Sequence, residues 1–207
     1  MKYLIFGLGN IGNEYAGTRH NIGFEVVDYM AYLQNIEFKP DRYAWTCEFT
    51  YKGRTIVLLK PTTYMNLSGK AVRYHLEKHK VEPQNILIIA DDKDIPLGSF
   101  KLKPKGSGGS HNGINNIVDT LHSVDFPRLR IGIGNDYAKG FQIDFVLGHF
   151  DENEKEQLRP CIVEATEIIK NFATQGIERT MNMFNKKKKD NTTLIDNPAS
   201  NKEKTEE

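Results

Sequence analysis

The stretch Ile86-Leu87-Ile88-Ile89-Ala90, followed directly by Asp91-Asp92, is the most informative segment for the fold. Five apolar residues without alternation predict a strand that is buried on both faces, as a central strand of an α/β sheet is. Amphipathic segments precede and follow it, at residues 67–79 and 115–121. The pattern therefore predicts an α/β domain whose polar site lies at the carboxyl end of this strand.

The remaining segments continue the alternation of strands and helices. Lys52-Gly53 between residues 45–51 and 55–59 is a hairpin signal, which favours a mixed sheet over an all-parallel one. Pro160 is expected to kink or restart the helix in which it lies. The other predicted strands are 3–6 and 128–133, and the other predicted helices are 24–33, 154–172 and 177–184. We predict one domain over residues 1–185, a twisted mixed β-sheet surrounded by α-helices.

Charge gives no global sign of a polyanionic partner. The 207 residues hold 28 Lys and Arg and 27 Asp and Glu, and residues 186–207 contain six of the lysines and five of the acids. Residues 1–185 are therefore neutral overall, and attraction to a polyanion must come from a local patch. The composition of residues 186–207 predicts a charged, disordered tail.

The cysteines and the apolar runs indicate the cellular compartment in which the protein works. Cys47 and Cys161 lie far apart in the sequence, which excludes a disulfide scaffold and a cysteine-based zinc site and fits a reducing compartment. The apolar run at the N-terminus is cut off by Gly7, too early for a signal peptide, and no run approaches the ~20 residues of a membrane span. We expect a soluble, cytoplasmic protein.

Gly7-Leu8-Gly9-Asn10-Ile11-Gly12 matches the GxGxxG pattern of dinucleotide sites directly after a predicted strand. Such a site needs the helix to begin within the motif, so that its N-terminus faces the pyrophosphate. Here residues 13–17 intervene, and no suitable acid follows on a second strand. We interpret the glycines as a tight turn from strand to loop, which makes a nucleotide-dependent oxidoreductase a poor alternative.

Three predicted loops each deliver an asparagine, namely Asn10, Asn66 and Asn112. His20 begins a helix, whose N-terminus disfavours imidazolium and keeps the ring able to accept a proton. Asp91, at a strand end, is suited to orient such a histidine. Asparagine amides both donate and accept hydrogen bonds, so they can grip a peptide and stabilise an oxyanion. These residues favour a hydrolase of a polar ester or amide.

Lys101, Lys103 and Lys105 precede a glycine-rich turn without an intervening acid. Backbone N–H groups and lysines at the start of a helix hold phosphate well, so the substrate is expected to be rich in phosphate. The alternative is a flexible solvated loop, which would explain the glycines and lysines.

Other polar clusters have simpler interpretations. Asn66 could cap a helix. The acids at 91–94 could hold Mg²⁺, although Lys93 lies among them and no P-loop is present. His75 and His79 share a helical face that we expect to be solvated. We predict no metal.

The chain resembles the bacterial peptidyl-tRNA hydrolase family through motifs in the family's order and spacing. The matching segments span residues 1–185 and are Gly7-Leu8-Gly9-Asn10…Tyr15…Thr18-Arg19-His20-Asn21, Lys60-Pro61…Thr63-Tyr64-Met65-Asn66…Ser68-Gly69, Asp91-Asp92…Asp94, Gly106…His111-Asn112-Gly113, Arg130-Ile131-Gly132-Ile133-Gly134 and Met181-Asn182…Phe184-Asn185. The resemblance implies a phosphorylase/hydrolase-like fold, a monomer without an obligate protein partner, and no cofactor.

The resemblance also implies a reaction and its residues. The substrate would be peptidyl-tRNA, and the bond cleaved would be the ester between the peptide and the tRNA. His20 would be the general base, Asp91 would orient it, and Asn10 would complete the catalytic set. The substrate-binding residues would be Tyr15, Tyr64, Asn66 and Asn112. Lys101, Lys103 and Lys105, with the C-terminal helix, would approach the acceptor stem, and Tyr15 would contact the tRNA's 3′ end.

Two positions depart from the family pattern. Ile11 stands where the family usually has proline, and Ser110 stands where a second glycine precedes His-Asn-Gly. The main competing hypothesis is a non-catalytic RNA-binding protein on the same fold. The presence of His20, Asp91 and all three asparagines argues against that alternative.

Overall fold

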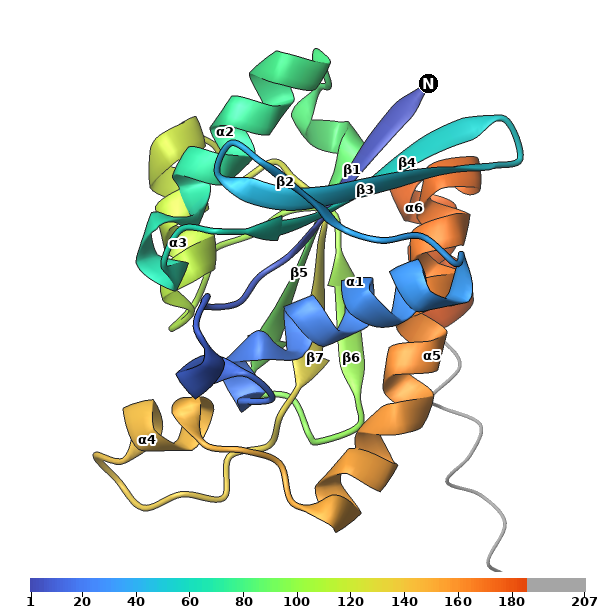
Figure 1. Ribbon diagram of the computed structural model, residues 1–207. Coiled ribbons are helices and arrows are strands. Elements are labelled where there is room, and N and C mark those ends of the chain that lie inside the picture. The colour runs from blue at the N-terminus through green and yellow to red at the C-terminus, as the bar shows by residue number, and fades with distance from the viewer. Residues whose placement is uncertain (186–207) are drawn as a thin grey trace, which may run out of the picture.

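The computed structural model describes residues 1–185, which form one α/β domain built on a seven-stranded mixed sheet (Figure 1). The strands are β1 Lys2–Gly7, β2 Lys39–Asp41, β3 Ala44–Tyr51, β4 Arg54–Pro61, β5 Ile86–Asp92, β6 Phe100–Lys103 and β7 Arg128–Gly132. The helices are α1 Ile22–Leu33, α2 Ser68–His79, α3 Asn112–Leu121, α4 Gln142–Leu147, α5 Glu152–Gln175 and α6 Ile177–Phe184. The predicted fold class is confirmed, and the predicted tail lies outside the described residues.

The sheet has the strand order β2-β3-β4-β1-β5-β7-β6. Its four inner strands β4, β1, β5 and β7 are parallel, and every residue of β5 is buried, as the apolar run predicts. One core packs α1, α5 and α6 on one face, and a second core packs α2 and α3 on the other (Figure 1). The carboxyl ends of the inner strands meet at one edge, where α/β sheets place their sites.

The predicted hairpin is formed by β3 and β4, which pair in antiparallel register from Ala44 opposite Pro61 to Tyr51 opposite Arg54. Its two turn residues, Lys52 and Gly53, both have positive φ angles, 47° and 74°. This is the backbone of a type I′ turn, whose twist matches that of the flanking strands.

A close contact between Gly7 and Gly23 fixes where α1 begins. A Cβ atom on Gly7 would lie 2.1 Å from the carbonyl oxygen of Gly23, and one on Gly23 would lie 2.4 Å from the backbone nitrogen of Leu8. Only glycine at both positions lets the first turn of α1 touch the end of β1. The first glycine of the GxGxxG pattern therefore serves packing of helix against strand.

The interpretation of residues 101–105 as a loop is wrong for its first part. Phe100–Lys103 forms the edge strand β6, antiparallel to β7, and the side chain of Asn185 exchanges two hydrogen bonds with the backbone of Leu102 (3.1 and 2.8 Å). Because β6 has only four residues and two of them are lysine, its periodicity is too short to be recognised. β2, with three residues, and α4, with six, are also too short for the sequence to predict.

α5 runs unbroken through Pro160, so this residue does not restart the helix. Pro160 lies on the exposed side, where water can hydrate the carbonyl group that loses its intrahelical partner. Both cysteines are buried thiols. Among the described residues, no helix is long and apolar enough to cross a membrane.

His75 contradicts the prediction of a solvated histidine face on α2, because its side chain is fully buried. Its Nε2 lies 3.0 Å from the carbonyl oxygen of Arg42, and its ring packs edge-on against Phe6. Burial lowers the pKa of His75 from 6.5 to about 4. The neutral ring is therefore part of the core.

This burial predicts an acid-sensitive fold. As the pH falls from about 6.5 to about 4, His75 binds a proton in the unfolded chain but not in the folded protein. His75 should therefore lower the free energy of unfolding by at most ~1.4 kcal/mol for each pH unit in this range. Urea unfolding from pH 7 to 4 should show a shallower loss in His75→Gln than in wild type. The exposed His122 provides the control His122→Gln; equal slopes in all three proteins would contradict the prediction.

Candidate active site

The loop that follows β1 and the end of the neighbouring strand β5 bring His20 and Asp91 into contact. His20 lies in the 3₁₀ turn Arg19–Asn21 that leads into α1, and Asp91 is the penultimate residue of β5. His20 Nδ1 lies 2.7 Å from Asp91 Oδ1, and the two side chains are 13% and 5% exposed. The contact of Gly7 with Gly23 places the start of α1, and therefore His20, against the end of β5.

His111 is a third member of this cluster, which sequence reasoning did not assign to the site. Its Nε2 lies 3.0 Å from the same Oδ1 atom of Asp91. Its Nδ1 accepts a hydrogen bond from the backbone N–H of Ile114, so His111 caps the N-terminus of α3. Nδ1 therefore carries no proton, and Nε2–H donates to Asp91. The only sequence signal for this role was a histidine at the start of a helix.

Asp91 fixes the tautomer of His20. Burial raises the pKa of the Asp91 carboxyl, but the electrostatic interactions and hydrogen bonds with His111 and His20 lower it by more, so the pKa lies below its usual value. An ionised carboxylate only accepts hydrogen bonds, so His20 must donate from Nδ1–H. Its Nε2 then keeps a lone pair, which is what a general base requires.

The same three residues are also the group of possible metal ligands in the described part of the chain, with ligand atoms within 4.8 Å of one another. Two nitrogens and one oxygen of this group are already joined by hydrogen bonds. Asp92 lines the same hollow but has other partners: its Oδ2 lies 2.7 Å from Arg130 Nε, and its Oδ1 accepts from the backbone N–H of Asp94. The arrangement therefore fits a hydrogen-bonded His–Asp–His cluster.

Asn10 joins two loops of the site. Its Oδ1 accepts from the backbone N–H of Met65 at 2.8 Å, and its backbone exchanges two hydrogen bonds with the side chain of Asn21. These contacts fix the orientation of the amide. Its Nδ2 makes no hydrogen bond to any described residue, and it is the group left to donate to a substrate.

The other predicted site residues do not all line the same hollow. Asn112, exposed at the start of α3, lines with His20, Asp91 and His111 a small hollow of about 70 Å³. Asn10 lines a separate hollow of about 270 Å³. Tyr15, Tyr64 and Asn66 line neither hollow.

Asn66 and Tyr64 are exposed near the start of α2. Asn66 lies in the 3₁₀ turn Met65–Leu67, and the residue that precedes α2 is Leu67, without a side-chain cap. Helix capping therefore does not account for Asn66, and its amide is available to a ligand.

Arg19, which precedes His20, holds the segment around α4 against the site. Its backbone N–H donates to the carbonyl of Gly148 at 2.9 Å, and its guanidinium donates to both carboxylate oxygens of Glu154 and to the carbonyl of His149. Its guanidinium carbon also lies 4.5 Å and 5.0 Å from the ring centres of Phe145 and Phe150. Sequence reasoning missed this role, because all the contacts are more than 120 residues away.

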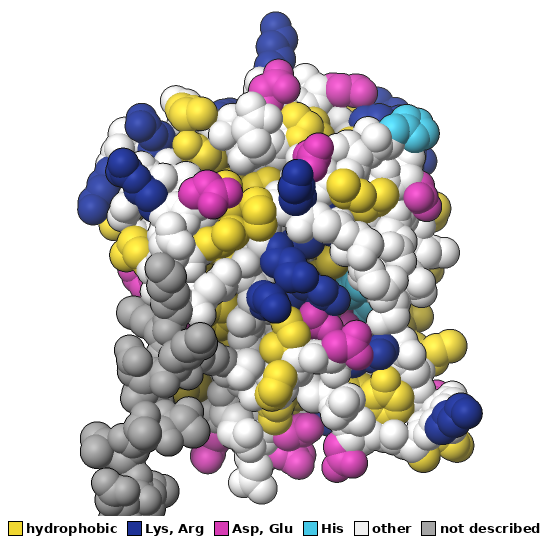
Figure 2. All heavy atoms as spheres, turned by 180° about the vertical axis from the view of Figure 1, so that it is seen from behind, with side chains coloured by type: hydrophobic (Ala, Val, Ile, Leu, Met, Phe, Trp, Pro, Cys, Tyr) yellow, Lys and Arg dark blue, Asp and Glu magenta, His cyan; other side chains and the backbone are white. Residues whose placement is uncertain are grey.

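The pairing of β6 with β7 arranges the predicted phosphate-binding lysines. Lys101 lies opposite Arg130 and Lys103 lies opposite Arg128, while the intervening Leu102 is buried in the core. Alternation places the four cations on the face away from that core. Lys and Arg side chains gather near the middle of the face seen in Figure 2, with acidic side chains beside them.

The cations on this face differ in availability. Arg128 is almost fully buried and donates to the carbonyls of Gly106, Ser107 and Val124, and burial lowers its pKa to about 10. It therefore holds the glycine-rich loop. Lys105 Nζ lies 3.9 Å from Asp125, whereas Lys101 is exposed and makes no ion pair with the described residues.

Comparison with known proteins gives a consistent set of relatives. A family model described as peptidyl-tRNA hydrolase matches residues 4–192. The peptidyl-tRNA hydrolases of Phocaeicola vulgatus and Cytophaga hutchinsonii are 52% and 50% identical over 90% and 91% of this chain and 100% of their own lengths. The crystal structure of the peptidyl-tRNA hydrolase from Acinetobacter baumannii superimposes with a TM-score of 0.84 at 36% identity, covering 89% of this chain and 94% of that one.

The cluster predicts a measurable tautomer. In wild type, the ¹⁵N chemical shifts of the His20 ring should show the proton on Nδ1, because Asp91 accepts it. In Asp91→Asn the fraction of His20 with its proton on Nδ1 should fall, since a neutral amide is a weaker acceptor than a carboxylate. Asp94→Asn, which changes a largely exposed acid on the same loop, should leave the shifts unchanged. The same tautomer in wild type and Asp91→Asn would show that Asp91 does not control it.

Proposed function

The chain belongs to the peptidyl-tRNA hydrolase family, whose activity is hydrolysis of the ester in peptidyl-tRNA, and we propose that His20 is the general base of that reaction. The observation that carries the proposal is the position of Asp91 Oδ1, 2.7 Å from His20 Nδ1 and 3.0 Å from His111 Nε2. This position leaves Nε2 of His20 free to accept a proton.

In the proposed reaction, Nε2 of His20 takes a proton from water as the water oxygen attacks the carbonyl carbon of the peptide's last residue. The tetrahedral intermediate then releases the ribose hydroxyl of the tRNA, which receives the proton from the imidazolium. Asp91 stabilises the imidazolium, and His111 holds Asp91 in place. Because Asp91 is already ionised and buried, it needs no rearrangement when the charge on His20 appears.

The asparagines are proposed to hold the substrate. Asn10 follows β1, Asn66 follows β4, and Asn112 begins α3. We propose that Nδ2 of Asn10 and the amides of the other two residues donate to the peptide and to the oxyanion. One preorganised donor to an oxyanion contributes on the order of 3 kcal/mol to the lowering of the barrier. Tyr15 is proposed to contact the 3′ end of the tRNA, and Tyr64, beside Asn66, is proposed to contact the substrate.

The acceptor stem is proposed to lie over the β6–β7 face. Lys101 and Lys103, supported by Arg130, offer phosphate contacts there, and Lys105 contributes less because Asp125 is close to it. We further propose that the protein acts as a monomer without a cofactor.

The general base has a direct test. His20→Ala should lower kcat for N-acetyl-aminoacyl-tRNA by two to four orders of magnitude, about the contribution of a general base, with little change in substrate binding. His122→Ala, which removes an exposed histidine elsewhere, should behave as wild type. Near-normal turnover by His20→Ala would contradict the mechanism. Binding without turnover by wild type would favour the non-catalytic RNA-binding alternative.

The lysines predict a salt effect. Each lysine that pairs with a phosphate contributes roughly 0.7–0.9 to the slope of log affinity against log salt. Lys101→Ala/Lys103→Ala should therefore raise KM, flatten its salt dependence by about 1.5 units and change kcat little, whereas Lys105→Ala should flatten it less. Lys52→Ala/Lys80→Ala is a control with two lysines from turns outside this face. A collapse of kcat with an unchanged salt slope would assign the lysines to catalysis.

A further inference from the structure

The hollow beside Asn10, of about 270 Å³, has no role in the reaction described above. Asn10 and Asn21 form one of its walls, and its other walls come from Ile11, α1 and the adjoining ends of β3 and β4. We propose that this hollow receives the side chain of the peptide residue that precedes the esterified one, and that it favours an apolar side chain there. This proposal rests on the proposed function and adds a peptide specificity to it.

The position of the hollow follows from the contacts of Asn10. The same residue whose Nδ2 is free to donate to the substrate forms the wall of the hollow, so a peptide held by Asn10 lies at its entrance. On the other side of the turn that carries His20, the catalytic hollow is lined by Lys93 and Arg130. Lys93 and Arg130 thus lie on the side proposed for the tRNA, and the hollow beside Asn10 lies on the side left for the peptide.

The lining of the hollow matches an apolar side chain. Trp45 is 50% exposed and Ile11 is 40% exposed, although both are large and hydrophobic. Phe24, on α1, is a third large apolar residue of the lining. An exposed aromatic ring beside an aliphatic side chain offers a site where a third apolar group loses contact with water. Burial of such a group stabilises the bound peptide.

The charged groups of the hollow are already neutralised by each other. Lys60 Nζ lies 2.5 Å from Asp28 Oδ1, and it lies 4.4 Å from the ring centre of Phe38 and 5.4 Å from that of Trp45. A lysine enclosed in this way is not available to an RNA phosphate. Glu25, at the rim, has its pKa raised by burial and by the nearby Asp28, so this region disfavours a second acid.

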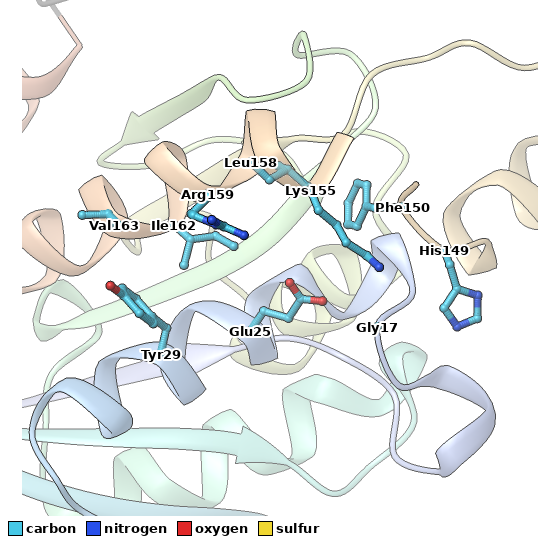
Figure 3. Close-up of a pocket in the computed structure, with 10 residues that line it drawn as sticks. All are labelled: Gly17, Glu25, Tyr29, His149, Phe150, Lys155, Leu158, Arg159, Ile162 and Val163. Carbon is cyan, nitrogen blue, oxygen red and sulfur yellow. The ribbon is translucent and has the colours of Figure 1, made fainter. Parts of the chain in front are cut away.

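A neighbouring hollow of about 480 Å³ between α1 and α5 shares only Gly17 and Glu25 with this one. Figure 3 shows Glu25 and Lys155 directed into it from the two helices. Neither Asn10 nor Asn21 lines it, so it is not continuous with the catalytic loops. The proposal therefore concerns the hollow beside Asn10 alone.

Matched substrates test the inference. Three N-acetyl-dipeptidyl-tRNAs should carry the same tRNA and the same esterified residue, with Phe, Gly or Asp before it, and N-acetyl-aminoacyl-tRNA should serve as the substrate without that residue. Wild type should cleave the Phe substrate with a kcat/KM about tenfold above that of the Gly substrate, a usual gain for an apolar pocket, and should disfavour Asp.

Trp45→Ala and Ile11→Ala should each remove most of the preference for Phe and leave the N-acetyl-aminoacyl-tRNA rate unchanged. That unchanged rate also shows that the variants fold. Tyr32→Ala, which removes an aromatic residue that is 77% exposed and lies outside the hollow, should keep the preference. Equal losses on all four substrates, or a wild type that does not distinguish Phe from Gly, would overturn the inference. If wild type cleaved none of the four, the proposed function itself would be wrong.

Discussion

The carboxylate of Asp91 is the group on which the site depends. One oxygen of this buried side chain accepts hydrogen bonds from two histidines, and those histidines stand at the starts of two different helices. The carboxylate thus joins the central strand β5 to α1 on one face of the sheet and to α3 on the other. A buried carboxylate that lost these partners would destabilise the fold, so the sheet and both helices must be assembled before His20 is held with its proton on Nδ1.

Backbone packing and loop contacts also hold His20 and Asp91 in this arrangement. Gly7 and Gly23 let α1 touch β1, and Asn10 ties the loop after β1 to the loop after β4. Arg19 then fastens the segment around α4 beside His20 through Glu154 and two aromatic rings. Arg19 and the two glycines therefore hold the scaffold, while Nε2 of His20 and Nδ2 of Asn10 make no hydrogen bond to a described residue.

Local patterns in the sequence predict the elements well, and they predict side-chain partners poorly. The run at 86–90 identifies a central strand because burial on both faces leaves no polar position, and Lys52-Gly53 identifies a hairpin because few residues tolerate positive φ. The link between His111 and Asp91 spans 20 residues and is created only when β5 and α3 meet. His75 looked solvated for the same reason: the loop and β1 residues that cover it are distant in the chain. β6 is too short for any period to show.

The hydrogen bonds between Asn185 and Leu102 bear on how copies of the chain behave together. An edge strand exposes unpaired backbone groups that can recruit a strand from another molecule and start aggregation. At one edge of the sheet, the Asn185 amide occupies the backbone N–H and C=O of Leu102, the middle of a four-residue strand rich in lysine. At the other edge, β2 has three residues, and its central Pro40 has no N–H to offer. Both edges of the described sheet are thereby protected against templating a second sheet, and a single amide near the end of the described chain secures one of them.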